Sequence, residues 1–207
     1  MPWADYFDHR AARFGAWYRN EWLTRLLGRG AIIDRLRYAV DVAENARARR
    51  VIDVGCGTGP LFEPLAKNGI KVFGIDPADN MSSRARAEAR RVGQGVSVRT
   101  AGWESLVGGA REFDLAVALG VFDYVSDPVA VLDAMRTVAG AVVASFPNAS
   151  LRTNIRRLRY GRSDVMVYGY TENELSDVFN AAGLKILECI QLGRSGFIVY
   201  ASEGTIS

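Results

Sequence analysis

Glycines and a carboxylate occur at the spacing of a small-molecule binding loop between residues 51 and 59. The segment reads Val-Ile-Asp-Val-Gly-Cys-Gly-Thr-Gly, so Asp53 stands two residues before the first of three alternating glycines. The β-branched residues predict a buried parallel strand. The glycines then let bare backbone approach a ligand, and the segment from Pro60 to Lys67 is expected to begin a helix there, with Pro60 in its first turn.

The spacing of these glycines separates the loop from two phosphate-binding loops. Counted from Gly55, Pro60 occupies the position where a dinucleotide fingerprint needs its third small residue. A Walker loop is excluded because no Gly-Lys-Ser or Gly-Lys-Thr follows. Asp53 would repel a pyrophosphate, whereas its carboxylate can accept hydrogen bonds from an ammonium group. A zwitterionic amino-acid group therefore fits the loop better than a phosphate does.

A second carboxylate, Asp76, ends the next predicted strand, which begins at Lys71. An acidic residue at this place can accept hydrogen bonds from both hydroxyls of a ribose. The segment from Asp53 to Gly59, with Asp76 downstream, resembles the cofactor site of the class I S-adenosylmethionine-dependent methyltransferases. The resemblance covers the chain from about residue 48 onward. It implies a doubly wound, Rossmann-like α/β fold with a seven-stranded, mostly parallel sheet, an antiparallel C-terminal hairpin and an N-terminal helical cap.

The resemblance also implies S-adenosylmethionine as the cofactor and names the residues that would contact it. Pro77 and Met81 would lie against the adenine, although Met81 also fits simple helix packing. Gly102 and Trp103 stand where the family usually has an acidic residue near the adenine amino group, so a backbone contact or ring stacking would replace that carboxylate. The expected cofactor-binding set is Asp53, Gly55, Cys56, Gly57, Thr58, Gly59, Asp76, Pro77, Met81, Gly102, Trp103, Leu119 and Gly120.

The elements that must position these residues follow in order along the chain. The apolar stretch 113–119 predicts a central fourth strand, and the ends of strands one and four flank the point where ligands bind in such sheets. Residues 119–124 should therefore line the methyl-donor cleft. The rest of the predicted domain consists of two helices and three strands. They are a helix from 128, a strand over 141–146, a helix that begins at the capping box Thr171–Glu174, and two strands over 184–192 and 197–201.

The acceptor side has three groups of candidates. Helical spacing over 3–27 and again over 32–43 predicts two cap helices, whose aromatic residues either wall the substrate pocket or only pack against the sheet. The arginine-rich segment 152–162 is either a lid that binds a carboxylate or phosphate, or a solvated helix face. The expected substrate residues are Tyr6, Phe14, Tyr18, Asp123, Arg156 and Arg159, and the catalytic candidates that could orient a nucleophile are Tyr124, Tyr168 and Tyr170.

The length and composition of the chain predict one domain with a single hydrophobic core and a small additional segment. The 207 residues divide into a cap over 1–47 and a cofactor-binding domain over 48–207, with a basic insert near 150–170. A net charge of +3 is too small to argue for a nucleic-acid or membrane partner. Two cysteines argue against a disulfide scaffold and suit a reducing cytosol, and the sequence suggests no metal site. We therefore expect a soluble, cytoplasmic protein.

The function that these residues indicate is methyl transfer to a small molecule, with oxygen as the expected acceptor atom. Such a transfer is a direct displacement whose leaving group needs no protonation, so it needs no obvious catalytic constellation. Asp123-Tyr124 and Ser145-Phe146-Pro147 are loosely similar to magnesium-protoporphyrin and ubiquinone-pathway O-methyltransferases. Two alternatives stay open: a methyltransferase-like module that binds the cofactor for regulation, and a methyltransferase directed at protein or RNA.

Overall fold

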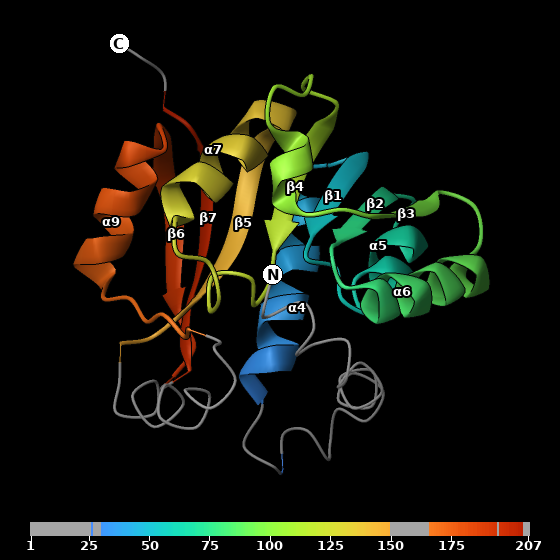
Figure 1. Ribbon diagram of the computed structural model, residues 1–207, viewed down its shortest axis with the longest axis horizontal. Coiled ribbons are helices and arrows are strands. Elements are labelled where there is room, and N and C mark those ends of the chain that lie inside the picture. The colour runs from blue at the N-terminus through green and yellow to red at the C-terminus, as the bar shows by residue number, and fades with distance from the viewer. Residues whose placement is uncertain (1–25, 27–29, 150–165, 194, 205–207) are drawn as a thin grey trace.

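A computed structural model describes residue 26 and residues 30–149, 166–193 and 195–204, and the description concerns these residues (Figure 1). The predicted first cap helix and the arginine-rich segment 152–162 lie outside them. Within the described ranges, no helix is both long and apolar enough to cross a membrane.

A seven-stranded sheet forms the centre of the molecule, in the order β3-β2-β1-β4-β5-β7-β6. The first five strands are parallel, and β7 runs antiparallel between β5 and β6. The chain order reverses between β1 and β4, which makes the sheet doubly wound, as predicted. The strands are β1 (Arg50–Val54), β2 (Lys71–Asp76), β3 (Val96–Thr100), β4 (Phe113–Ala118), β5 (Ala139–Pro147), β6 (Leu184–Gln191) and β7 (Gly196–Glu203).

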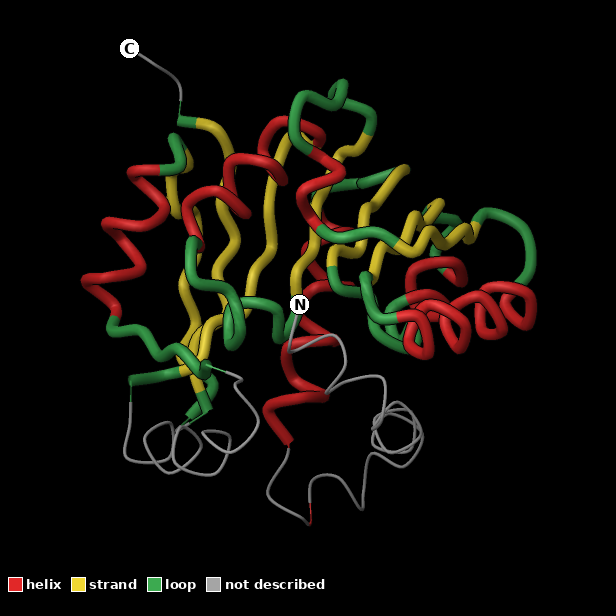
Figure 2. The backbone as a smooth tube through the Cα atoms, in the orientation of Figure 1, coloured by secondary structure: helices red, strands yellow, loops and turns green. Residues whose placement is uncertain are grey.

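Helices cover both faces of this sheet, so the central strands are apolar on both sides (Figures 1 and 2). One core cluster joins Val51 and Leu115 to residues of α4, α5 and α6, and the other joins Ile52 and Ala116 to residues of α7 and α9. Neighbouring residues of one strand thus enter different cores. The helices are α4 (Gly30–Asn45), α5 (Phe62–Lys67), α6 (Asp79–Val92), the 3₁₀ helix η1 (Trp103–Leu106), α7 (Pro128–Val138) and α9 (Glu172–Ala181).

Several predicted element boundaries differ from the structure, and local hydrogen bonds explain two of them. Helix α5 begins at Phe62 rather than at Pro60, because Gly59 adopts φ +80° and its carbonyl accepts from the Phe62 N–H in a separate turn. Strand β5 begins at Ala139, two residues earlier than expected, because Ala139 pairs with Phe113 of β4. The capping box of α9 is confirmed: the Thr171 hydroxyl accepts from the Glu174 N–H, and the Glu174 side chain accepts from the Thr171 N–H.

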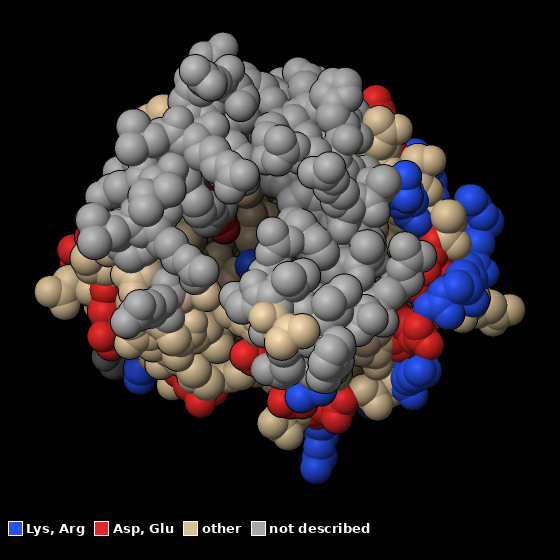
Figure 3. All heavy atoms as spheres, turned by 90° about the horizontal axis from the view of Figure 1, so that it is seen from below, with Lys and Arg blue, Asp and Glu red and all other residues tan. Residues whose placement is uncertain are grey.

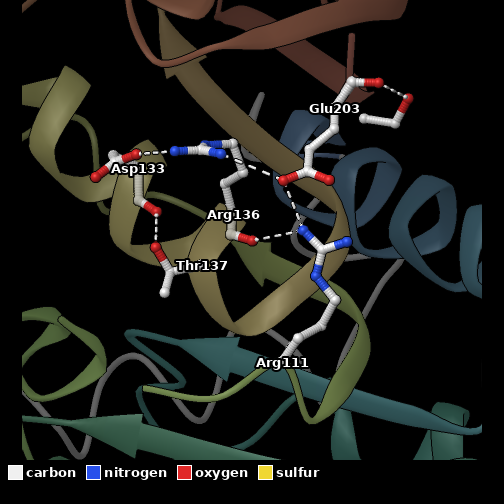
Figure 4. A network of polar contacts seen from close by, with 6 residues as sticks. Arg111, Asp133, Arg136, Thr137 and Glu203 are labelled. Carbon is white, nitrogen blue, oxygen red and sulfur yellow. Dashed lines mark hydrogen bonds and ion pairs between the residues drawn. The ribbon is translucent and has the colours of Figure 1, made fainter. Parts of the chain in front are cut away.

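A network of ion pairs lies at the end of the sheet where the parallel strands begin (Figure 4). Glu203, at the end of β7, pairs with Arg111 at 2.6 Å and with Arg136 of α7 at 3.2 Å. Arg136 also pairs with Asp133 at 2.5 Å. Arg111 and then Arg136 hold the pKa of the Glu203 carboxyl below its usual range. The network therefore fastens the last strand to α7 and to the segment before β4.

Candidate functional site

The glycine loop after β1 is held against the end of β2 by backbone hydrogen bonds. The N–H groups of Gly55 and Cys56 both donate to the Ile75 carbonyl, at 2.8 and 2.9 Å. Gly55 and Gly57 have φ values of +71° and +55°, which L side chains rarely adopt. A Cβ on Gly55 would lie 2.5 Å from the Val121 side chain, whereas one on Gly57 would meet no atom within 4 Å. Gly55 is therefore required by packing, and Gly57 borders open space.

The Asp76 carboxylate fixes the tip of this loop. Its Oδ2 accepts from the Gly57 N–H at 2.9 Å, and its Oδ1 accepts from the Ala78 N–H at 2.9 Å. The side chain is buried, and the Asp76 carbonyl accepts from the Ala101 N–H after β3. The carboxyl ends of β1, β2 and β3 thus meet around one carboxylate.

Asp53 is a buried carboxylate to which no described residue donates a hydrogen bond. Its side chain, on β1, is 3% exposed. Burial, and secondarily the charge of Asp76, raise the pKa of the Asp53 carboxyl from 3.8 to about 8. A carboxylate in such surroundings is costly unless it is paired. A cationic ligand group beside Asp53 would supply the missing partner.

The end of β3 carries an acidic group that the sequence analysis did not include in the site. Gly102 and Trp103 occupy the expected position, but the carboxylate of Glu104 lies so close to Gly102 that a Cβ there would clash with its Oε2. Trp103 begins η1, and its half-buried ring packs against the core. The acidic residue of this strand end therefore comes two positions after Gly102, in the short 3₁₀ helix.

Gly120, just after β4, lies between two side chains that sequence reasoning missed. Its φ is +80°, and its N–H donates to the Ser145 hydroxyl of β5 at 2.9 Å. Both terminal nitrogens of Arg35, on α4, would lie 3.2 Å from a Cβ at Gly120. The Arg35 Nε is buried and has no hydrogen-bond partner in the described structure. Arg35 belongs to no local motif, and Ser145 stands out only as part of Ser145-Phe146-Pro147, so only the tertiary fold shows that both reach this strand end.

Three of the acceptor-side candidates come together beyond β4 and β5. The Tyr168 N–H donates to the Asp123 carbonyl at 2.9 Å, and the Tyr170 N–H donates to the Pro147 carbonyl at 2.9 Å. Asp123 and Tyr170 are buried, and the Tyr170 ring lies edge-on to Phe146 at 5.2 Å. Burial first, then the charges of Tyr168, Asp123 and Glu174, raise the pKa of Tyr170 to about 12. Tyr124 continues the same turn.

The remaining expected residues are described by their burial alone. The Cys56 side chain is buried, and burial raises its thiol pKa, so only its backbone can face a ligand. Met81 is buried on α6, while Thr58, Pro77 and Leu119 are half-buried. No cluster of three or more metal-binding side chains exists in the part of the chain that is described. Tyr6, Phe14, Tyr18, Arg156 and Arg159 lie outside the described residues.

Seen toward the carboxyl ends of the parallel strands, the molecule has a hollow in which acidic and basic atoms are visible (Figure 3). Asp53, Asp76 and the glycine loop lie at the ends of β1 and β2, and Arg35 and Asp123 lie near the end of β4. This edge is where ligands bind in doubly wound sheets. The arrangement can hold a ligand that has both a cationic and an anionic group.

Comparisons with known proteins agree with this geometry. The family described as "Methyltransferase domain" matches residues 20–189. A ubiquinone biosynthesis O-methyltransferase of Methylobacterium sp. (strain 4-46) is 40% identical over 92 residues, which are 44% of this chain and 36% of that protein. Its counterpart from Cereibacter sphaeroides (strain KD131) is 30% identical over 148 residues, covering 65% of this chain and 60% of that protein. The chain thus spans less than two thirds of these relatives.

A solved structure of similar fold covers nearly the whole chain. The magnesium protoporphyrin IX methyltransferase of Synechocystis PCC 6803, crystallised with bound S-adenosylhomocysteine, superposes with a TM-score of 0.77 at 21% identity. The superposition covers 97% of both chains. At this identity the likeness establishes the fold alone.

Proposed function

Because the chain belongs to the methyltransferase domain family, we propose that it transfers a methyl group from S-adenosylmethionine to a small-molecule acceptor. The acceptor atom is oxygen, which the names of both curated relatives support. The acceptor is a small organic molecule rather than a nucleic acid, and the reaction takes place in the cytoplasm, where the free thiols of Cys56 and Cys189 would remain reduced. In this proposal residues 1–47 are the cap and residues 48–207 are the cofactor-binding domain, to which α4 of the cap adds Arg35.

The described residues fit the cofactor group by group. The Asp53 carboxylate accepts from the ammonium of the methionine part, and the Arg35 guanidinium pairs with its carboxylate. The Asp76 carboxylate, at the end of β2, accepts from the ribose hydroxyls. The bare edge of Gly57 leaves room for the ligand, since a side chain would project into unfilled space there. Glu104 is placed to accept from the adenine amino group at the end of β3.

The bound cofactor supplies a methyl group on a positively charged sulfur, which is displaced without help from an acid. The chain's own residues therefore have to bind, orient and exclude water. Gly120 follows the end of β4, where we propose that cofactor and acceptor meet. The Ser145 hydroxyl fixes this backbone by accepting from the Gly120 N–H. Tyr124, Tyr168 and Tyr170 are available on the acceptor side to orient the nucleophile.

The observation that carries the proposal is the Asp53 carboxylate, which is buried beside a glycine loop without a donor from the described residues. A phosphate-bearing nucleotide would place negative charge next to it, whereas the ammonium of a methionine group satisfies it. This separates S-adenosylmethionine from a dinucleotide at the same edge of the same type of sheet.

Calorimetric titration tests the proposal with the full chain. We expect binding of S-adenosylmethionine and S-adenosylhomocysteine, weaker binding of adenosine, and no binding of NAD. Binding of NAD in preference to S-adenosylhomocysteine, or the absence of binding by both cofactor forms, would contradict the proposal. Formation of S-adenosylhomocysteine in the presence of hydroxylated small molecules separates an enzyme from a binding module. RNA binding that weakens steeply with salt would instead favour an RNA-directed enzyme.

A further inference from the structure

The backbone that leaves β4 is held by a side chain of the neighbouring strand. The last paired residues of β4 and β5 are Ala118 and Ala144. Beyond this pair the Gly120 N–H donates to the Ser145 hydroxyl at 2.9 Å, and Gly120 adopts φ +80°. Ser145 is only 5% exposed, so the bond is largely shielded from competition by water. A buried hydroxyl therefore sets the course of the chain after β4.

The guanidinium of Arg35 lies against this fixed glycine. Both of its terminal nitrogens are 3.2 Å from the position that a Cβ on Gly120 would take, so glycine leaves space that a larger residue would fill. The Arg35 Nε is buried and has no hydrogen-bond partner in the described structure. A buried donor of this kind is costly unless a ligand supplies an acceptor. The contact thus holds a cationic group that an anionic ligand group can complete.

The helix that carries Arg35 is fastened to the sheet independently of this contact. Ile33 of α4 is buried, and the Tyr38 hydroxyl donates to the Glu188 carboxylate of β6 at 2.6 Å. An arginine side chain nevertheless has many rotamers, so a fixed helix does not by itself fix the guanidinium. Its place at the end of β4 depends on what it packs against there, which is Gly120.

We propose that Ser145 is a positioning residue for the cofactor site. Its hydroxyl fixes the Gly120 peptide, and Gly120 in turn holds the Arg35 guanidinium where it pairs with the carboxylate of the methionine part. This arrangement reduces the side-chain entropy that the arginine loses when the ligand binds. The inference rests on the proposed function and adds a residue that acts on the amino-acid part of the cofactor without touching it.

The first test compares two ligands that differ in the amino-acid part. Calorimetry on the full chain measures S-adenosylhomocysteine and adenosine with the Ser145→Ala variant. We expect about twofold to tenfold weaker binding of S-adenosylhomocysteine, as for the loss of one neutral hydrogen bond, and unchanged binding of adenosine, which lacks the carboxylate. Ser202→Ala is the matched control, because Ser202 pairs with Ala141 near the start of β5, and it should leave both affinities unchanged.

Two further variants show whether the serine acts through the arginine. Gly120→Ala places a Cβ against the guanidinium and should reproduce the ligand-specific loss. Gly108→Ala, with φ +72° and open space around it, is matched for backbone strain and should bind both ligands as the wild type does. The double variant Arg35→Ala with Ser145→Ala should bind S-adenosylhomocysteine as weakly as Arg35→Ala alone, because coupled residues are not additive.

Three results would overturn the inference: unchanged S-adenosylhomocysteine affinity in Ser145→Ala, an equal loss for adenosine, or additive losses in the double variant. An equal loss for adenosine would assign the serine to the general stability of the site. The wild-type titration with S-adenosylhomocysteine comes first, and its failure would contradict the proposed function itself.

Discussion

Gly57 donates its backbone N–H to the Asp76 carboxylate at 2.9 Å, which joins the glycine loop of β1 to the end of β2. The bond connects the two motifs in this chain, because Gly57 leaves its backbone bare and Asp76 fixes that backbone in place. Asp76 therefore has two functions in the proposed site, one toward the loop and one toward the ribose. Its substitution should affect both.

We expect Asp76→Ala to weaken S-adenosylhomocysteine binding by about tenfold to more than a hundredfold, because charge-assisted hydrogen bonds contribute about 1.5–3 kcal/mol each. Loss of the bonds to Gly57 and Ala78 should also lower the melting temperature while the fold is kept. Calorimetry and circular dichroism measure the two effects. Asp76→Asn retains one acceptor oxygen, so its affinity for S-adenosylhomocysteine should lie between those of Asp76→Ala and the wild type. Unchanged affinity in both variants would contradict the ribose role.

A side chain at Gly57 should abolish cofactor binding by more than its conformational cost. The left-handed conformation costs an alanine about 1–2 kcal/mol, and the added atoms would also project where we place the cofactor. Gly69→Ala is a matched control, since Gly69 has φ +74° and equally free space beyond α5. Both Gly57→Ala and Gly69→Ala should lose similar stability in thermal melts, but only the first should lose binding. Equal affinity in the two variants would mean that the turn is purely structural.

The free energy of unfolding should fall as pH rises from about 4 toward 8, through Asp53. Its pKa is about 8 in the folded protein and 3.8 ordinarily, so between these values the folded state holds a proton that the unfolded chain has released. Burial and, after it, the charge of Asp76 both oppose its ionisation. Denaturation across this pH range should therefore show a slope that Asp53→Asn removes.

The same carboxyl should link cofactor binding to proton release. The ammonium group is proposed to pair with ionised Asp53, so below pH 8 binding must displace the proton, and affinity should increase with pH up to that value. Calorimetric titrations in buffers of different ionisation enthalpy measure the released proton directly. Proton uptake on binding, or no exchange at pH 7, would show that Asp53 does not face the ammonium.

Arg35 should contribute to cofactor affinity although it belongs to no recognisable motif. Arg35→Ala removes the guanidinium beside Gly120 and should weaken S-adenosylhomocysteine by about tenfold or more, as expected when a charged hydrogen-bonding partner is lost. Adenosine, which lacks the carboxylate, should bind the variant and wild type equally. Arg37→Ala on the same helix serves as control. An equal loss for adenosine would assign Arg35 to helix packing instead.

The ion pairs around Glu203 should affect stability without affecting binding, since they lie at the opposite end of the sheet (Figure 4). The pKa of Glu203 is lowered in the folded protein, so its contribution exists above its ordinary pKa of 4.5 and is lost as pH falls through the folded value. The pairs are partly exposed, so Glu203→Gln should cost at most about 1 kcal/mol. In thermal melts the difference between variant and wild type should be smaller at pH 3 than at pH 7, and a change in S-adenosylhomocysteine affinity would contradict the separation.

Most of what could be predicted about the fold and the candidate site rests on local sequence motifs. Asp53, the glycines and Asp76 lie within 24 residues, so strand periodicity and turn chemistry are enough to place them at one sheet edge. The antiparallel hairpin and the capping box of α9 follow from equally local patterns. These are properties that a short stretch of sequence determines.

Residues that meet only through the tertiary fold could not be found in this way. Arg35 and Ser145 reach Gly120 from a helix and a strand that are distant in sequence, so no local spacing of residues predicts these contacts. Glu104 was missed because a 3₁₀ turn, rather than a strand residue, returns its carboxylate to Gly102. The expectations for Arg156 and Arg159 concern a segment outside the described residues, and a lid there stays a prediction.

The placement of β7 between β5 and β6 has a consequence for biosynthesis. A ribosome delivers β5 and β6 before β7, yet β5 pairs with residues 196–202 along nearly its whole length, and β6 pairs with no described strand other than β7. Until those residues emerge, both strands expose unpaired backbone, which is a template for association between nascent chains. The parallel half of the sheet can form during translation, but the domain closes only with its last strand, so chaperone protection is needed most in that interval.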